Sequence, residues 1–212
     1  MVQNKTKKEN DYAHLFAASR PDGVQRAKTI SGPAGHPPFA AGIAQLRQAD
    51  FAPEVVYVTP LQRTAQTARV FFPGAKLIPV DGLKEMNFGR FEGQTFVQVE
   101  QDPEYLAWVQ ENEHAAHPNG ERRSDFCNRV CKTLADLIDK ALAEGQERLV
   151  IVAHGGTQMA ALERFGVPRR SFHDWCGPNA GGYVLDAADW AEKRQLRLVK
   201  TVQYTKDAEA GV

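Results

Sequence analysis

A histidine directly follows an apolar run in the stretch LVIVAHGGTQMAAL, residues 149–162. Two glycines come next, and a second apolar run begins after the threonine that follows them. A strand that ends in this way can deliver an imidazole to a ligand, because ligands of parallel sheets bind beyond the carboxyl ends of the strands. His154 is therefore a candidate functional residue, and a hydrogen-bonded structural histidine at a strand end is the alternative.

Alternating apolar runs and helical spacings indicate the elements that position this residue. Strands are predicted at 12–18, 54–58, 75–80, 149–154, 181–187 and 196–204, and helices at about 40–50, 59–72, 124–144 and 155–165. This alternation is typical of βαβ units and predicts an α/β fold, a three-layer α/β/α sandwich with a mainly parallel sheet. Arg63 follows the second strand as His154 follows the fourth, so two junctions could aim a cation and an imidazole at one place.

The helix after the second strand also carries a predicted start signal. Thr59 is expected to be its N-cap, with Pro60 at the first helical position and Gln62 completing a capping box. Residues 83–120 are predicted to be rich in loops with short helical pieces. The expected organisation is a polar tail over residues 1–11, a single domain over 12–205 and a second tail over 206–212.

Composition bounds the classes of partner. The chain has 212 residues, enough for one domain with a sizeable core, and 26 basic residues balance 26 acidic ones. This balance gives no reason to expect a nucleic acid or an anionic membrane as partner, and no apolar run approaches the roughly 18 residues that span a bilayer. Three cysteines form no disulfide framework, which favours the cytoplasm, and they lack the further ligands of a metal site. No metal or organic cofactor is expected, and the oligomeric state stays open.

Four patches, taken together and in order, resemble the histidine phosphatase superfamily, which includes the phosphoglycerate mutases and the α-ribazole phosphatase-like enzymes. They are YVTPLQRTAQTA (57–68), LKEMNFGRFEGQT (83–95), PNGE (118–121) and VAHGGT (152–157). The resemblance extends from about residue 12 to residue 202 and implies a phosphoglycerate mutase-like fold. PNGE and the modest length resemble the α-ribazole phosphatase-like branch more than the large mutases.

The resemblance also implies roles. Arg63 matches the arginine that holds phosphate oxygens, a task that suits its planar fork. Glu85 matches the general acid that protonates the leaving oxygen. His154 matches the second pocket histidine, which binds the transferring phosphoryl group, and the N–H groups of Gly155 and Gly156 favour an anion at a helix start. Taken singly, Arg63 could be a surface residue in an ion pair and Glu85 a solvated loop carboxylate.

The first strand departs from the family pattern, which ends it in Arg-His-Gly with a nucleophilic histidine. Here the register places Ala18, Ser19 and Arg20 at these positions, and no histidine lies between His14 and His36. The hydroxyl of Ser19 would fall short of a ring nitrogen by about 2 Å. It would also need a base, and we expect a histidine held among cations to be protonated instead. Arg20 could restore part of the lost positive charge; a plain turn with a solvated arginine is the alternative.

Two classes of function remain open. One is a pocket for inorganic phosphate or a small phosphomonoester, bounded by Ser19, Arg63, Glu85 and His154, with weak or no classical phosphatase activity. The alternative is an active phosphomonoesterase that uses an altered nucleophile or water, and a mutase is least expected. The sequence does not identify the substrate, nor the roles of three further histidines, His114, His117 and His173.

Overall fold

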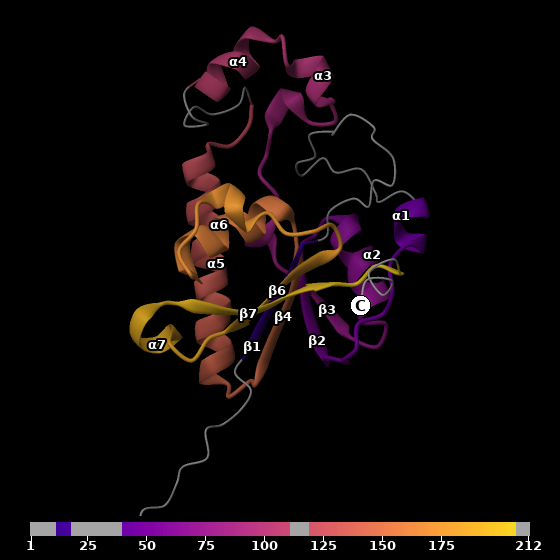
Figure 1. Ribbon diagram of the computed structural model, residues 1–212, viewed down its shortest axis with the longest axis vertical. Coiled ribbons are helices and arrows are strands. Elements are labelled where there is room, and N and C mark those ends of the chain that lie inside the picture. The colour runs from indigo at the N-terminus through magenta and orange to yellow at the C-terminus, as the bar shows by residue number, and fades with distance from the viewer. Residues whose placement is uncertain (1–11, 18–39, 111–118, 207–212) are drawn as a thin grey trace, which may run out of the picture.

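The computed structural model describes residues 12–17, 40–110 and 119–206 (Figure 1). Within these residues a seven-stranded sheet runs in the order β3-β2-β4-β1-β6-β7-β5. The strands are β1 (Tyr12–Ala17), β2 (Val55–Val58), β3 (Lys76–Pro79), β4 (Arg148–Ala153), β5 (Gly166–Val167), β6 (Gly181–Asp186) and β7 (Leu196–Gln203). Neighbours are parallel from β3 to β1 and between β7 and β5, and β6 is antiparallel to both β1 and β7. The sheet is therefore mainly parallel, as the sequence predicted.

The central strand β4 is buried on both faces because its side chains alternate between two hydrophobic cores. Leu149, Ile151 and Ala153 face the larger core, and Val150 and Val152 face the smaller one. This explains why the run LVIVA is continuously apolar instead of alternating with polar residues.

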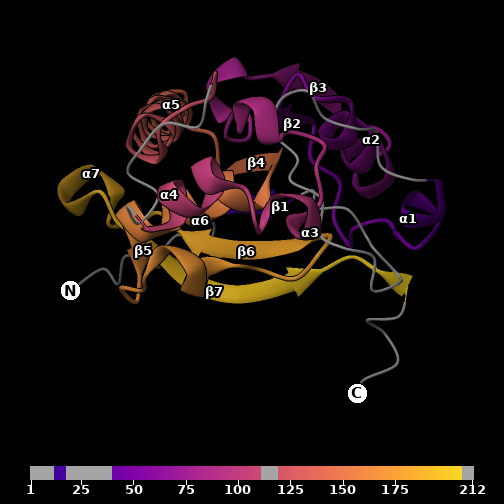
Figure 2. The ribbon, with the colours of Figure 1, turned by 90° about the horizontal axis from the view of Figure 1, so that it is seen from above.

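Helices cover the two faces of the sheet and complete three layers (Figure 2). The helices are α1 (Ala40–Ala44), α2 (Gln62–Phe71), α3 (Phe96–Val99), α4 (Pro103–Gln110), α5 (Arg123–Ala143), α6 (Gly155–Phe165) and α7 (Trp190–Lys193). Three short 3-10 turns are η1 (Asp81–Leu83), η2 (Gly89–Phe91) and η3 (Phe172–Trp175). The helices α5 and α6 pack on the face of the larger core, and α2 packs on the other face with Phe71 fully buried.

Two local predictions were wrong. The helix predicted at about 40–50 ends at Ala44, because the chain then pairs with the C-terminal segment: Leu46 bridges Thr205, and the N–H of Arg47 donates to the carbonyl of Tyr204. The helix α2 begins at Gln62 with Leu61 as its N-cap and no side-chain cap. Thr59 is therefore not the N-cap. Its hydroxyl is instead hydrogen-bonded to the side chains of His154 and Thr64.

The helices α3 and α4 lie above α6, beyond the carboxyl ends of the parallel strands (Figure 1). Asp102 orders this part of the chain, since its carboxylate accepts the N–H of Glu104 at 2.9 Å and binds the guanidinium of Arg90. Beneath it, the ring of Tyr105 packs edge-on against Phe91 at 5.7 Å and lies 5.8 Å from the ring of Trp108. In the described residues no helix combines the length and apolarity that a membrane crossing requires.

Candidate functional site

His154 directly follows β4 and is the N-cap of α6, with an extended backbone and an exposure of 2%. Both of its ring nitrogens are hydrogen-bonded within the protein. Nε of Arg63 donates to Nδ1 at 3.2 Å, and Nε2 lies 2.9 Å from the hydroxyl of Thr59. A nitrogen that accepts from a guanidinium carries a lone pair, so the proton of the neutral ring resides on Nε2 and is donated to Thr59.

The contact between Arg63 and His154 follows from the topology. The strands β2 and β4 are parallel neighbours with Val58 opposite Val152, so their carboxyl ends lie side by side. Arg63 is the second residue of α2, which follows β2, and its side chain is 7% exposed. The predicted convergence of the guanidinium and the imidazole is therefore a direct hydrogen bond between two buried side chains.

Two threonines fix the ring from the side of β2. The Thr59 hydroxyl lies 3.0 Å from the Thr64 hydroxyl, which donates to the carbonyl of Leu61 at 2.8 Å. The bonds then run in one direction, from His154 through both hydroxyls to a backbone acceptor. Both threonines are buried, at 1% and 0% exposure, which makes each lost bond costly. Thr59, which follows β2, thus positions His154 and does not cap α2.

Glu85 lies in the loop after η1 and reaches the start of α6. Its Oε2 accepts the N–H of Gly156 at 3.1 Å, and its Oε1 accepts the N–H of Met86 at 3.0 Å. A Cβ on Gly156 would lie 2.2 Å from Oε1, so only glycine permits this approach. A Cβ on Gly155 would meet nothing within 4 Å, which leaves space over the first residue of the helix. The expectation that both glycine N–H groups face a bound anion does not hold for Gly156, because its N–H binds the acid.

Burial and charge shift the proton affinities of the site in opposite directions. Desolvation raises the pKa of Glu85 above its usual 4.5, although the N–H groups of Met86 and Gly156 and the charges of Arg63 and Arg129 act to lower it. Burial holds the pKa of His154 well below 6.5, and the charges of the same two arginines lower it further. Without a bound anion, His154 is therefore neutral near pH 7. In the free site the expectation of a protonated histidine does not hold, because neighbouring cations disfavour a further positive charge.

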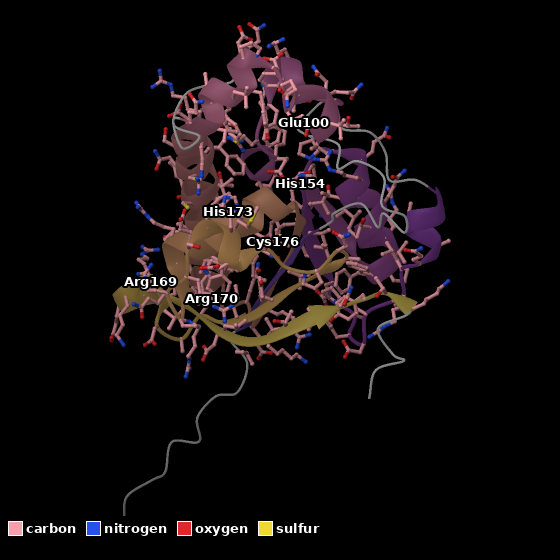
Figure 3. The ribbon with its side chains drawn as sticks, turned by 45° about the horizontal axis from the view of Figure 1, so that its top comes forward. Glu100, His154, Arg169, Arg170, His173 and Cys176 are labelled. Atoms are coloured by element: carbon pink, nitrogen blue, oxygen red, sulfur yellow. The ribbon has the colours of Figure 1, made fainter. Side chains whose placement is uncertain are left out.

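The structure brings Arg63, Glu85, His154 and Gly155 together at the carboxyl ends of β2, β3 and β4, and Figure 3 places His154 at this end of the sheet. Four other residues discussed from the sequence lie outside the described residues: Ser19, Arg20, His114 and His117. His173 is exposed on η3, where its ring meets Phe172 edge-on at 5.2 Å. No contact of its side chain with Arg63, Glu85 or His154 is observed, so it is not part of this arrangement.

Sequence reasoning missed Thr64 and Arg129 as members of the site. Arg129 is one of 26 basic residues and sits on a long helix, so nothing in its local sequence marks it. Among the described residues, no group of three or more histidine, cysteine, aspartate or glutamate side chains could hold a metal ion. The arrangement can bind an anion through arginine and transfer a proton through a carboxyl group whose affinity for protons is raised.

Known proteins resemble this chain in sequence and in fold. The family model of the histidine phosphatase superfamily (branch 1) matches residues 39–199. A curated relative, a candidate phosphoserine phosphatase of Hydrogenobacter thermophilus, is 29% identical over 114 residues, covering 51% of this chain and 54% of the relative. The chain thus matches about half the length of that relative.

Three solved structures share the fold. The α-ribazole phosphatase of Shigella flexneri has a TM-score of 0.69 at 22% identity, covering 89% of this chain and 93% of its own. A mycobacterial glucosyl-3-phosphoglycerate phosphatase has a TM-score of 0.66 at 20% identity, covering 92% and 98%. A phosphoglycerate mutase of Thermus thermophilus has a TM-score of 0.60 at 21% identity, covering 90% and 98%. At these identities the likeness shows the three-layer fold predicted from the sequence.

Proposed function

Because the chain belongs to the histidine phosphatase superfamily (branch 1), we propose that Arg63 and His154 bind inorganic phosphate or the phosphoryl group of a small phosphomonoester, in a pocket also bounded by Glu85 and Ser19. The hydrogen bond from Arg63 to His154 carries this proposal, since it joins two buried polar side chains from separate strand ends. Gly155 contributes space and a helix start beside them.

Catalysis by a covalent phosphohistidine is not expected of this chain. The strand β1 pairs with β4 up to Ala17 opposite Ala153, the residue before His154. Ser19 follows Ala17 by two positions, where the family pattern has its nucleophile, and a hydroxyl is shorter than an imidazole by about 2 Å. A displacement of about 1 Å can cost roughly a hundredfold in rate. The neutral His154 is a poor base for Ser19, because its Nδ1 already accepts from Arg63.

The alternative is an active phosphomonoesterase of the α-ribazole phosphatase type, with water or Ser19 as nucleophile and Arg20 as a further phosphate ligand. Glu85 is the observation in its favour. Burial raises the pKa of this carboxyl, and a higher affinity for protons suits a group that donates a proton to a leaving oxygen. A pocket that only bound phosphate would gain nothing from a carboxylate beside it, since the two would repel each other.

Isothermal titration with inorganic phosphate and a set of phosphomonoesters tests the binding site. We expect the wild type to bind and Arg63→Ala to lose binding, while Arg69→Ala, which removes an exposed arginine from the same helix, binds as the wild type does. Absence of heat with the wild type, or equal heat with Arg63→Ala, would defeat the proposal.

Release of inorganic phosphate from an aryl phosphate distinguishes the two functions. Activity that appears only in Ser19→His would identify the natural chain as a phosphate-binding relative without its nucleophile. Robust activity in the wild type that is lost in Glu85→Gln would establish the phosphomonoesterase. Equal robust activity in the wild type and in Ser19→His would contradict the role of the serine position.

A further inference from the structure

Glu121, the last residue of the PNGE patch, forms a two-pronged ion pair with Arg129 of α5. Nε of Arg129 donates to Oε1 at 2.9 Å, and Nη2 donates to Oε2 at 2.7 Å. The two side chains are 18% and 29% exposed, so solvent screens this pair less than a surface one. A bidentate pair of this kind fixes orientation as well as distance.

The two residues of this ion pair also form hydrogen bonds with the loop that carries Glu85, on both sides of Glu85 in the sequence. Nη1 of Arg129 donates to the carbonyls of Gly82 at 2.9 Å and Lys84 at 3.1 Å. On the other side of Glu85, the N–H of Glu121 donates to the carbonyl of Asn87 at 2.8 Å. A single guanidinium and its partner therefore hold the backbone both before and after the acid.

The loop also packs closely against α5, which further restricts the movement of its backbone. A Cβ on Gly82 would lie 2.1 Å from the Thr133 hydroxyl, which itself donates to the carbonyl of Arg129. From the opposite side, the hydroxyl of Thr157 in α6 donates to the carbonyl of Leu83 at 3.0 Å. The position of the loop is thus determined by α5 and α6 together.

We propose that Glu121 and Arg129 are positioning residues, which hold Glu85 against the start of α6. They thereby determine whether its carboxyl group is placed to donate a proton in the pocket. The inference rests on the proposed function only for the role of Glu85 as an acid. It assigns a task to the PNGE patch, for which the sequence offered none.

The ion pair acts on Glu85 by charge as well as by position. Arg129 lowers the pKa of Glu85, as Arg63 does from the side of α2, while Lys84 is paired with Asp81 at 2.9 Å. Loss of the charge of Arg129 should therefore raise the pKa of Glu85. Loss of the charge of Glu121 leaves Arg129 less neutralised and should lower it.

The opposite signs give a test that simple damage to the fold cannot imitate. The carboxyl of Glu85 is titrated by carbon-13 NMR without ligand, with Glu85→Gln to assign its signal. We expect Arg129→Gln to move the titration to higher pH and Glu121→Gln to move it to lower pH. The control Lys132→Gln breaks an ion pair with Asp136 on the same helix, at 77% and 63% exposure, and should leave the titration in place.

Arg129→Lys separates position from charge and serves also if Arg129→Gln does not fold. It keeps the charge but loses the fork, so amide exchange at Met86 and Gly156 should rise at least about tenfold while the titration moves little. Shifts of the same sign in Arg129→Gln and Glu121→Gln, or unchanged exchange in Arg129→Lys, would overturn the inference. Because no measurement uses phosphate, a failure to bind phosphate would refute the proposed function and leave this test intact.

Discussion

Binding of an oxyanion should make the protein take up a proton on His154. The free site holds this ring neutral, since burial and the charges of Arg63 and Arg129 keep its pKa well below 6.5. Protonation would place a hydrogen on Nδ1, the atom that now accepts from Arg63. The ring can then donate to the anion, and the Nε–H of Arg63 is released to do the same.

The magnitude follows from the charge of the ligand. At about 4 Å and an effective dielectric constant of about 20, one unit of opposite charge favours the protonated ring by about 4 kcal/mol. That energy corresponds to roughly a thousandfold change in the protonation equilibrium. A dianion should therefore raise the pKa of His154, and at a pH between the free and bound pKa values close to one proton should be taken up per anion. Between the pKa values of the free and bound states, the dissociation constant should then fall about tenfold for each unit by which the pH is lowered.

Titration calorimetry with sulfate measures this uptake, because sulfate stays a dianion throughout and contributes no protons of its own. The binding enthalpy is measured in several buffers and plotted against the ionisation enthalpy of each buffer. The slope of this plot is the number of protons exchanged on binding. We expect a slope near one for the wild type and near zero for His154→Gln. Glu85→Gln should keep the slope, since Glu85 is the other group whose proton affinity could respond. A slope lost in Glu85→Gln but kept in His154→Gln would refute the reasoning.

Two further predictions concern the bonds that fix the site. Gly156→Ala should displace the carboxyl of Glu85 and lower the free energy of unfolding by about 1–3 kcal/mol, whereas Gly155→Ala should fold at least as stably as the wild type. Urea unfolding of both variants checks this, and equal losses would contradict it. Thr59→Val should lower the free energy of unfolding by about 1–3 kcal/mol, because it removes the hydrogen-bond partner of buried His154, whereas Thr59→Ser should retain most of the wild-type stability. A valine variant as stable as the wild type would contradict this prediction.

The sequence anticipated the parts of the site that depend on the order of strands and helices. Arg63 and His154 each follow a buried apolar run, and parallel strands bring such positions to one edge of the sheet. Their direct hydrogen bond is a consequence of that topology. The spacing of apolar residues likewise predicted α5 at 124–144, within one residue of its observed bounds, Arg123–Ala143.

The features of the site that the sequence did not predict depend on contacts between side chains far apart in the chain, which local sequence patterns do not encode. Thr59 has the residue type and spacing of a helix cap, but its hydroxyl binds an imidazole 95 residues away. Arg129 resembles any polar helix residue until the fold sets it beside the loop of Glu85. The neutral state of His154 in the free site depends on its burial and on the charges of Arg63 and Arg129, which the sequence around the histidine does not reveal.

A crystal structure of the protein grown with phosphate tests the central claim most directly. We expect a tetrahedral anion within hydrogen-bond distance of the guanidinium of Arg63 and the ring of His154, with the bond between these two residues broken or lengthened from 3.2 Å. A phosphate bound elsewhere on the protein, with that bond intact, would contradict it.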